Sequence, residues 1–358
     1  MKVKNLKLDN FRNHTKREFC FDSDLVIICG PNGSGKTNIL ESLSFLSHGK
    51  SQRAVVEKDM IRINYDFSKS TALLEDGTNV EIIASVNPMT QRVLKVFKIN
   101  NVEKKNVNYI GRLKTVMFAP EDIKIVSGSP SRRRDYLDRL LSQIFIDYRK
   151  NLLAYEKALK NRNALLEQIR NYGNSRENSL QLEVWNERFV SHGEEVLKKR
   201  LSFFEFANKH FKEISNQLFR SELYCELDYY KSEIANHKLN NFLERDIRAG
   251  VTTFGPHRED FGMFVYKNGI KMDLKNFGSR GQQRTAVLCL KILEIKFIEE
   301  LTKEKPILLM DDIFSELDDE YRLSIRNIMD DLQTLITTAD EKMIPDELRE
   351  RALMIRLL

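Results

Sequence analysis

The stretch that decides the fold is a glycine-rich segment with the pattern Gly-x4-Gly-Lys-Thr, and it runs Gly30-Pro31-Asn32-Gly33-Ser34-Gly35-Lys36-Thr37. An apolar run over 25–29 predicts a buried strand before it, and the apolar spacing of 39–46 predicts a helix after it. In such a loop, backbone N–H groups point at a polyphosphate, Lys36 adds a point charge and the Thr37 hydroxyl can bind Mg²⁺. A glycine-rich turn that matches by accident is the alternative, but the flanking strand and helix argue against it. We expect residues 30–38, including Asn38, to bind a nucleoside triphosphate.

Composition sets outer limits on the class of protein. The 358 residues are 41% hydrophobic and 31% charged, which is typical of a soluble globular protein with one large core or two moderate ones. No apolar run approaches the roughly 18 residues of a membrane span, and the four cysteines are too scattered for a zinc site or a disulfide framework. The net charge of +6 permits a polyanionic partner without requiring one. We expect a cytoplasmic protein with no membrane partner.

The chain has three sections. Residues 1–125 are rich in strand patterns, residues from about 130 to 220 are helical, and an α/β pattern returns from about 250. Breaker residues at 171–175 divide the helical section, which predicts an antiparallel helical hairpin whose arms could also split into shorter helices. We therefore expect an α/β fold in which a mostly α-helical domain, 126–244 (lobe II), is inserted into a discontinuous nucleotide-binding domain, 1–125 and 245–358 (lobe I).

A second part of the nucleotide site follows the apolar segment 306–310, which predicts a buried strand ending in Asp311 and Asp312. Asp311 is placed to hold Mg²⁺ directly or through water, together with Thr37. Asp312 is the candidate to orient or deprotonate an attacking water. An ordinary acidic turn is the alternative. The candidate catalytic residues are Lys36, Asp311 and Asp312.

Another glycine-containing segment, 277–283, opens a strongly apolar helix, with Ser279 as the expected N-cap. Its glycines would let an anion approach the backbone, although a plain helix start is the alternative.

Taken together, these segments resemble the ABC-type ATPase family, with the order P-loop, helical insertion, Ser-x-Gly-Gln signature and acidic strand end. A segment over 315–318 is similar to that family's D-loop, with Ser315 and Asp318 as its functional positions. The resemblance implies a two-lobed head with a mixed sheet that dimerises around two ATP molecules. The signature of one head would then complete the nucleotide site of the other; it consists of Ser279, Arg280, Gly281 and Gln282.

Within that family the chain resembles the RecF family, which is related to the SMC and chromosome-repair ATPases. The segments that carry this resemblance span nearly the whole chain and are 10–13, 118–122, 127–138, 253–260 and 311–318. The resemblance implies an ATP-dependent, sequence-independent DNA-binding homodimer that acts at single-strand gaps or junctions. It also implies slow ATP hydrolysis, RecR and RecO as partners, and promotion of RecA loading.

The resemblance also concerns individual residues. It implies that Arg12 and Asn13 contribute to the nucleotide site. Asp312 stands where a glutamate is usual, so hydrolysis is expected to be slow. Thr337 and Thr338 stand where a histidine is expected.

Basic residues provide candidate DNA contacts: Arg132, Arg133, Arg134, His257 and Arg258. For the three consecutive arginines, helix-start charges or an ion pair between lobes are equally good explanations. For His257 and Arg258 the alternative is a structural turn after Gly255-Pro256.

Two other functions remain open from the sequence. An ATPase subunit of a membrane transporter would share the P-loop and signature, but the spacing between them is longer than a transporter head usually needs. A small-molecule kinase would leave the signature unexplained. No guanine-specific Asn-Lys-x-Asp motif is present, so ATP is the expected nucleotide.

Overall fold

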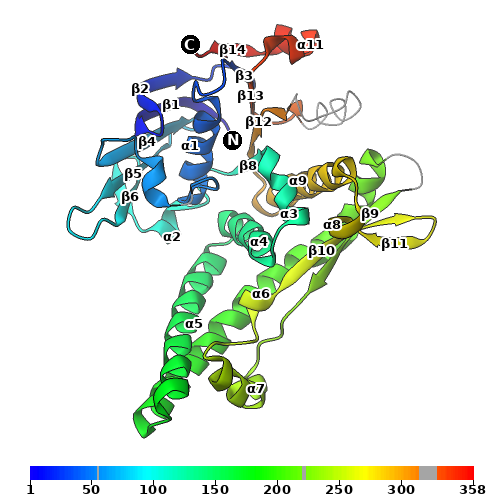
Figure 1. The fold of residues 1–358 in the computed structure, drawn as a ribbon. Coiled ribbons are helices and arrows are strands. Elements are labelled where there is room, and N and C mark those ends of the chain that lie inside the picture. The colour runs from blue at the N-terminus through cyan, green and yellow to red at the C-terminus, as the bar shows by residue number, and fades with distance from the viewer. Residues whose placement is uncertain (55, 220–222, 314–328) are drawn as a thin grey trace. The chain divides into compact units, whose positions relative to one another are not determined.

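The structure is a computed structural model that describes residues 1–54, 56–219, 223–313 and 329–358. The expected D-loop positions Ser315 and Asp318 therefore lie outside the described residues. The chain divides into two compact units, drawn in Figure 1. Unit 1 consists of Met1–Ile123 and Val287–Leu358, and unit 2 is Lys124–Ala286.

Unit 1 contains two sheets. An antiparallel sheet has the strand order β2-β1-β4-β5-β6-β7. Its strands are β1 (Val3–Phe11), β2 (His14–Cys20), β4 (Phe67–Leu74), β5 (Asn79–Val86), β6 (Val93–Ile99) and β7 (Val102–Lys104). The second sheet has the order β14-β3-β13-β12-β8, and every neighbouring pair in it is parallel. Its strands are β3 (Leu25–Cys29), β8 (Thr115–Phe118), β12 (Ile307–Asp311), β13 (Thr334–Thr338) and β14 (Leu353–Arg356).

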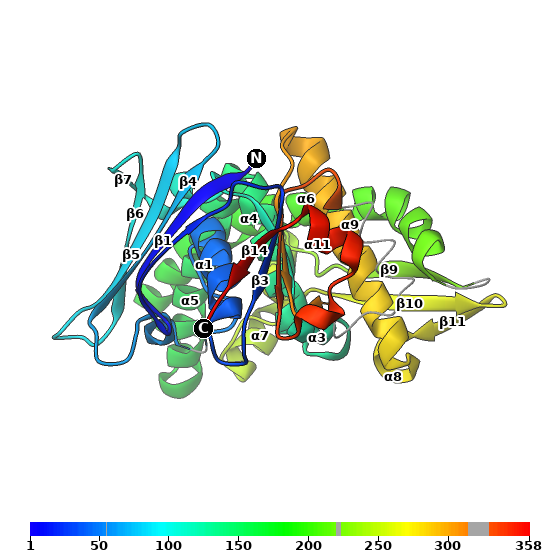
Figure 2. The ribbon, with the colours of Figure 1, turned by 90° about the horizontal axis from the view of Figure 1, so that it is seen from above.

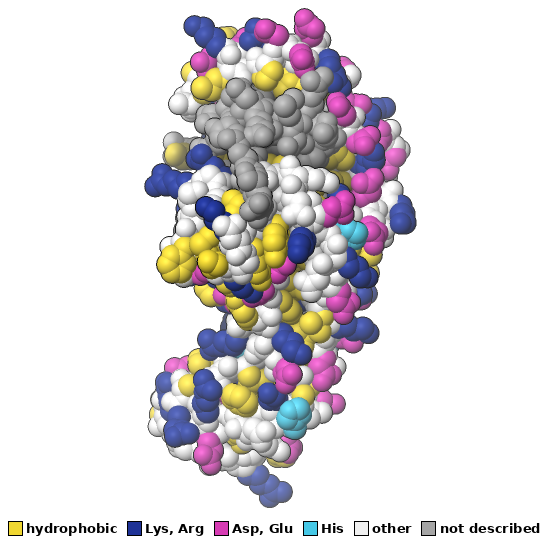
Figure 3. All heavy atoms as spheres, turned by 90° about the vertical axis from the view of Figure 1, so that its right-hand side faces the viewer, with side chains coloured by type: hydrophobic (Ala, Val, Ile, Leu, Met, Phe, Trp, Pro, Cys, Tyr) yellow, Lys and Arg dark blue, Asp and Glu magenta, His cyan; other side chains and the backbone are white. Residues whose placement is uncertain are grey.

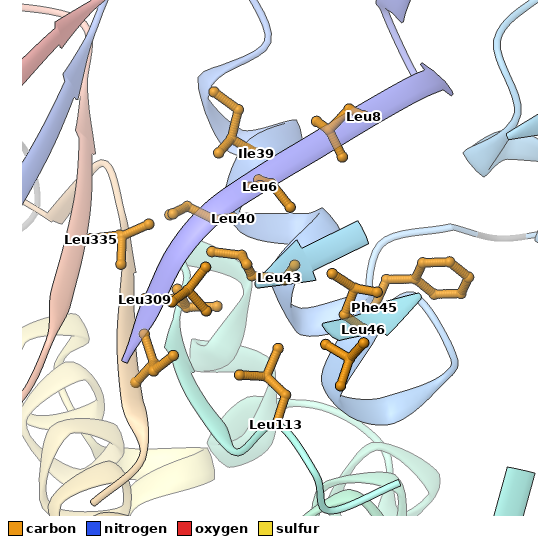
Figure 4. Close-up of a cluster of buried hydrophobic side chains, with 14 of the residues drawn as sticks. Leu6, Leu8, Ile39, Leu40, Leu43, Phe45, Leu46, Leu113, Leu309 and Leu335 are labelled. Atoms are coloured by element: carbon orange, nitrogen blue, oxygen red, sulfur yellow. The ribbon is translucent and has the colours of Figure 1, made fainter. Parts of the chain in front are cut away.

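Helix α1 (Lys36–His48) lies between these two sheets, as Figure 2 shows. Because it is covered on both sides, ten of its residues are buried, and five of these are the apolar residues Ile39, Leu40, Leu43, Phe45 and Leu46. Its leucines and isoleucine meet Leu6 and Leu8 of β1, Leu309 of β12 and Leu335 of β13 in one hydrophobic cluster (Figure 4). This packing fixes the N-terminal end of α1 against the ends of β12 and β13.

Short helices complete the connections of unit 1. They are η1 (Glu57–Met60), α2 (Asn106–Tyr109), η2 (Pro120–Asp122), η5 (Glu341–Met343) and α11 (Asp346–Arg351). Two further helices contain the boundaries between the units: α3 (Ile123–Ser127) and α9 (Arg280–Thr302).

Unit 2 is built on long helices: α4 (Pro130–Ile144), α5 (Ile146–Tyr172), α6 (Arg176–Leu218) and α7 (Asn236–Ala249). Helices α5 and α6 lie side by side (Figure 1), joined by residues 173–175, so the predicted hairpin is present. Ser175 caps α6 by accepting a hydrogen bond from the backbone N–H of Asn178 at 3.1 Å. The first predicted arm splits into α4 and α5 at Phe145, whose backbone is extended.

A three-stranded antiparallel sheet, β11-β10-β9, also belongs to unit 2. Strand β9 (Tyr224–Tyr230) pairs along its whole length with β10 (Asp260–Lys267), which turns back into β11 (Ile270–Asp273). Helix η3 (Pro256–Arg258) precedes β10, and α8 (Leu274–Phe277) follows β11. Because of this pairing, unit 2 continues to residue 286, whereas the sequence placed the end of the inserted domain at 244.

On the face drawn in Figure 3, Lys and Arg side chains are interspersed with Asp and Glu, and hydrophobic side chains also gather there. In the part of the chain that the structure describes, no helix combines the length and apolarity needed to cross a bilayer.

Candidate nucleotide-binding site

The site begins where β3 ends and the glycine-rich loop turns into α1. Gly35 caps the helix with a backbone φ of +100°, and Lys36 is the first helical residue. The Lys36 ammonium group folds back over the loop and donates to the carbonyl oxygens of Gly30 at 2.7 Å and Pro31 at 3.0 Å. These contacts hold a cation over the loop, in front of the positive end of a helix of 13 residues.

Ser34 gives a second indication that the loop accepts an anion. Its Oγ atom is buried and has no hydrogen-bond partner among the described residues. Buried hydroxyl groups are normally paired, and phosphate oxygens would supply the missing acceptor. Gly30 makes room for this side chain, since a Cβ atom there would lie 2.9 Å from Ser34 Oγ. The loop therefore fits a polyphosphate.

Thr37 and Asp311 meet as the sequence predicts. The Thr37 hydroxyl donates to Asp311 Oδ1 at 2.7 Å, and Asp311 is buried at the end of β12. In the described ranges, no group of three or more His, Cys, Asp or Glu side chains is arranged so that it could hold a metal ion. Mg²⁺ does not need one, because it is commonly held by one or two protein oxygens together with phosphate oxygens and waters. The hydroxyl oxygen of Thr37 and the carboxylate of Asp311 are suitable ligands for Mg²⁺.

Thr337 on the neighbouring strand also contacts Asp311. It is the register partner of Asp311 in the parallel pair of β12 and β13. Its hydroxyl donates to Asp311 Oδ1 at 2.7 Å and accepts a hydrogen bond from the backbone N–H of Asp312 at 3.0 Å. One threonine side chain thus joins both acidic residues.

The turn between β1 and β2 packs against the loop. Asn13 donates from Nδ2 to the Gly33 carbonyl oxygen at 3.1 Å, and Asn38 donates to Asn13 Oδ1 at 2.9 Å. The Arg62 guanidinium donates to the Asn13 carbonyl oxygen. Asn13 is exposed and lies beside the phosphate-binding loop.

His14 makes a contact that we did not predict from the sequence. Its ring is buried, and Nε2 lies 3.1 Å from the Gly35 carbonyl oxygen. Burial lowers the pKa of His14, and the hydrogen bond to Gly35 opposes that effect. The ring is therefore neutral near pH 7, with the Nε2 proton donated to Gly35.

Arg12 is held by an acidic side chain of α1. Its guanidinium binds both carboxylate oxygens of Glu41, at 2.6 and 3.0 Å, and donates to the Asp59 carbonyl oxygen at 2.8 Å. Glu41 is buried and also accepts from Ser51 Oγ at 2.5 Å. Buried Glu41 was not predicted either. In the sequence, the only indication of this buried carboxylate is that Glu41 is a charged residue on the apolar face of the helix predicted after the loop.

Ser279 caps α9 as predicted. Its Oγ accepts from the Gln282 N–H at 3.2 Å, and the Gln282 side chain accepts from the Ser279 N–H at 2.9 Å. This reciprocal pair is a capping box. Ser279, Arg280 and Gly281 are all exposed, so the signature segment is accessible at the start of a long helix.

The three consecutive arginines at the start of α4 have different environments. Arg133 is buried and forms a double hydrogen bond with Asp260 at 2.6 and 2.9 Å. Arg134 donates to the Glu259 carbonyl oxygen at 2.8 Å, whereas Arg132 is exposed. For Arg133 the geometry favours a structural ion pair, here within unit 2.

His257 and Arg258 lie in η3 and both bind backbone. His257 Nδ1 accepts from the Tyr155 hydroxyl at 2.7 Å, and Nε2 donates to the Thr252 carbonyl oxygen at 3.1 Å. Burial lowers the pKa of His257 to about 4. Arg258 donates to the same Thr252 oxygen, at 2.8 Å from Nη2. These contacts favour the structural turn over a DNA contact for His257.

The parallel sheet, the loop before α1, the acidic end of β12 and the capped start of α9 define an ABC-type ATPase head. A family model described as "RecF/RecN/SMC N terminal domain" matches residues 2–355. The chain belongs to the RecF family, as the sequence resemblance indicated, and the predicted fold class is confirmed.

Curated relatives match over nearly their full length. The chain is 35% identical over 368 residues to the DNA replication and repair protein RecF of Lysinibacillus sphaericus, covering 98% of this chain and 96% of the relative. It is 34% identical over 374 residues to RecF of Oceanobacillus iheyensis, covering 100% of this chain and 98% of the relative.

Solved structures agree with this assignment. A structure described as the recombination mediator protein RecF-ATP in the RecFOR pathway superposes with a TM-score of 0.85 at 33% identity, covering 96% of this chain and 93% of that one. An SMC head domain from Pyrococcus furiosus superposes with a TM-score of 0.53 at 18% identity, covering 95% and 90% of the two chains. The SMC likeness concerns the fold alone.

Proposed function

We propose that this chain is an ATP-dependent DNA-binding protein of recombinational repair and replication maintenance. The observation that carries the proposal is the hydrogen bond between Thr37 and Asp311, which brings the phosphate-binding loop and the acidic end of β12 together. The RecF relatives, named as DNA replication and repair proteins, support the cellular role. The RecF structure described with ATP supports that nucleotide as the ligand.

Residues 30–38 would hold the phosphates. Lys36 would exchange its two carbonyl contacts for phosphate oxygens, and Thr37 and Asp311 would hold Mg²⁺, whose charge offsets that of the phosphates. During hydrolysis the water oxygen bonds to the γ-phosphorus, the bond to the ADP oxygen breaks, and Asp312 would accept the proton. Because aspartate is shorter than glutamate, we expect slow turnover, suited to a switch.

ATP would also drive dimerisation. The signature at the start of α9, Ser279 to Gln282, in which the first three residues are exposed, would face the γ-phosphate bound by a second copy of the chain. The N-terminal end of α9 would then add a second positive helix end to the phosphates. Nucleotide binding would thereby shift the population from monomer to dimer.

The dimer would bind duplex DNA at gaps or junctions without regard to sequence. Phosphate contacts from lysine and arginine give salt-sensitive binding of this kind. Of the candidate DNA contacts, Arg132 and Arg258 have exposed side chains. RecR and RecO are the proposed partners, with RecA loading as the outcome. The words "RecFOR pathway" in the description of the RecF neighbours support these partners.

The first experiment is a titration of labelled duplex DNA with and without ATP and Mg²⁺, at two salt concentrations. Anisotropy would report DNA binding and light scattering would report mass. We expect ATP to produce a dimer that holds DNA, and higher salt to weaken the complex. ATP binding without any change in mass or DNA affinity would contradict the switch.

Two variants separate the steps. Lys36→Ala should lose nucleotide affinity, whereas Lys50→Ala, an exposed lysine just beyond the other end of α1, should not. Ser279→Arg should keep ATP binding and fail to dimerise, while Gln181→Arg on the exposed surface of α6 should dimerise normally. A Ser279→Arg protein that dimerises would exclude the proposed geometry.

A further inference from the structure

Thr337 occupies a special position in the parallel sheet. Strands β12 and β13 place it directly beside Asp311, and it is fully buried. Asp311 Oδ1 accepts two hydroxyl hydrogen bonds, both of 2.7 Å, one from Thr37 and one from Thr337. Two donors on one oxygen fix the rotation of the carboxylate about its Cβ–Cγ bond. The second oxygen, Oδ2, has no hydrogen-bond partner in the part of the chain that the structure describes.

The next residue, Asp312, has an unusual backbone. Its φ of +49° lies in the left-handed region, which aspartate adopts at a cost and only where surrounding contacts support it. Thr337 provides such a contact, because its hydroxyl oxygen accepts the Asp312 N–H at 3.0 Å. The direction in which the Asp312 side chain leaves the strand depends on this turn of the backbone.

We propose that Thr337 is a positioning residue for ATP hydrolysis, which acts through Asp311 and Asp312 without touching the nucleotide. The Thr337 hydroxyl proton fixes the carboxylate of Asp311, the proposed metal ligand. A lone pair of the same oxygen accepts the backbone N–H of Asp312, the candidate general base, and fixes its backbone. The inference rests on the proposed ATPase function and adds to it a residue that sets the geometry of both carboxylates. The hydroxyl group is the part of Thr337 that matters, since both contacts are made by Oγ1.

Packing alone is the competing explanation, because a buried threonine also fills space. Serine and valine separate the two explanations. Thr337→Ser keeps the hydroxyl and removes the methyl group, whereas Thr337→Val keeps the shape and removes the hydroxyl. Thr334 at the other end of β13 provides a matched control, since it is equally buried but its hydroxyl donates to the Leu332 carbonyl oxygen at 3.3 Å.

The experiment measures steady-state ATP hydrolysis by the full chain at saturating DNA, as kcat and KM for ATP at several Mg²⁺ concentrations. We expect Thr337→Val to lower kcat by about 10-fold to 100-fold, as misplaced catalytic groups commonly do. KM for ATP should change by less than about 3-fold, because Lys36 and the loop keep their contacts. The Mg²⁺ concentration for half-maximal rate should rise. Thr337→Ser and Thr334→Val should stay within about 3-fold of the wild type in all three quantities.

Each result has a defined meaning. An unchanged kcat in Thr337→Val, with an active wild type, would overturn the positioning role and leave the ATPase proposal intact. Equal losses in the valine and serine variants would assign the effect to packing and also overturn it. A wild-type chain that binds no ATP would overturn the proposed function itself. If Thr337→Val no longer unfolds cooperatively, Thr337→Ala, which removes the crowding methyl groups, takes its place in the comparison.

Discussion

The side-chain amide of Asn13 donates a hydrogen bond to the carbonyl oxygen of Gly33 at 3.1 Å, and so joins the turn after β1 to the phosphate-binding loop. Asn38, in the first turn of α1, completes the link by donating to Asn13 Oδ1 at 2.9 Å. Arg12 in the turn and Asn10 near the end of β1 both have left-handed backbone. The conformation of the turn therefore depends on contacts of this kind, and the loop and the turn support each other.

Asn13→Ala should weaken ATP binding about 5-fold, because one neutral hydrogen bond contributes about 1 kcal/mol. Isothermal titration calorimetry with a slowly hydrolysed ATP analogue measures the effect. Asn5→Ala is the matched control, since Asn5 lies on β1, the strand that leads into this turn, but donates to Glu18 at 2.9 Å, away from the loop. Equal dissociation constants for the two variants would exclude a role for Asn13 at the nucleotide.

Gly35→Ala should destabilise the nucleotide-free protein more than Gly33→Ala does. Both glycines have positive φ, so alanine strains the backbone at either position by about 1 kcal/mol or more. At Gly35 the added Cβ would also lie 2.5 Å from Asn13 Oδ1, whereas at Gly33 nothing lies within 4 Å. Urea unfolding should give a free energy of unfolding about 2 kcal/mol lower for Gly35→Ala than for Gly33→Ala. Equal free energies of unfolding for the two variants would show that the turn accommodates the added Cβ atom without a loss of stability.

The elements that the sequence predicts best are those with strong local patterns. The strand predicted over 25–29 is β3 itself, because an uninterrupted apolar run before a glycine-rich loop has few alternatives. Strands β9 and β14 were not predicted. Residues 353–356 form β14 because they pair with β3, which lies more than 300 positions earlier. The local sequence around 353–356 does not identify β3 as the partner strand.

The site was predictable to a similar degree. Thr37 and Asp311 could be paired because each follows a motif with a fixed structural context. The bonds of Thr337 depend on the register between β12 and β13, which the sequence does not specify. Arg133 and His257 were candidate DNA contacts because they are basic residues in segments that carry the family resemblance. The structure buries or half-buries them among partners from distant segments.

Arg162→Met should strongly destabilise unit 2. Arg162 and Asp246 are both fully buried and form an ion pair of 2.8 Å between α5 and α7. Removing the guanidinium leaves an uncompensated buried carboxylate, which costs about 3–5 kcal/mol. The control is Glu167→Ala, which removes an exposed ion pair with Arg170 and should cost less than about 1 kcal/mol. Denaturant unfolding followed by circular dichroism gives the free energy of unfolding of both variants. Similar losses in Arg162→Met and Glu167→Ala would show that protonation or water compensates the buried Asp246 carboxylate.

The stability of the protein should fall in mildly acidic solution because of His257. Burial lowers its pKa from 6.5 to about 4, so the folded state binds the proton less readily than the unfolded state. Between these two values the unfolded chain carries more protons, and the free energy of unfolding therefore rises with pH. The contribution is fully present above about pH 6.5 and is lost as the pH falls through about 4, with a size on the order of 3 kcal/mol.

The structural basis of this prediction is the neutral ring of His257, which accepts from Tyr155 and donates to Thr252. Protonation would remove the acceptor and add a charge near Arg258, Arg134 and Arg162, each of which lowers the pKa further. In urea unfolding between pH 4 and pH 8, His257→Gln should show a flatter dependence on pH than the wild type. His237→Gln, at an exposed position on α7, should retain the wild-type slope. If His257→Gln also retains it, other groups produce the acid sensitivity, and the hydrogen bonds of His257 do not constrain its protonation.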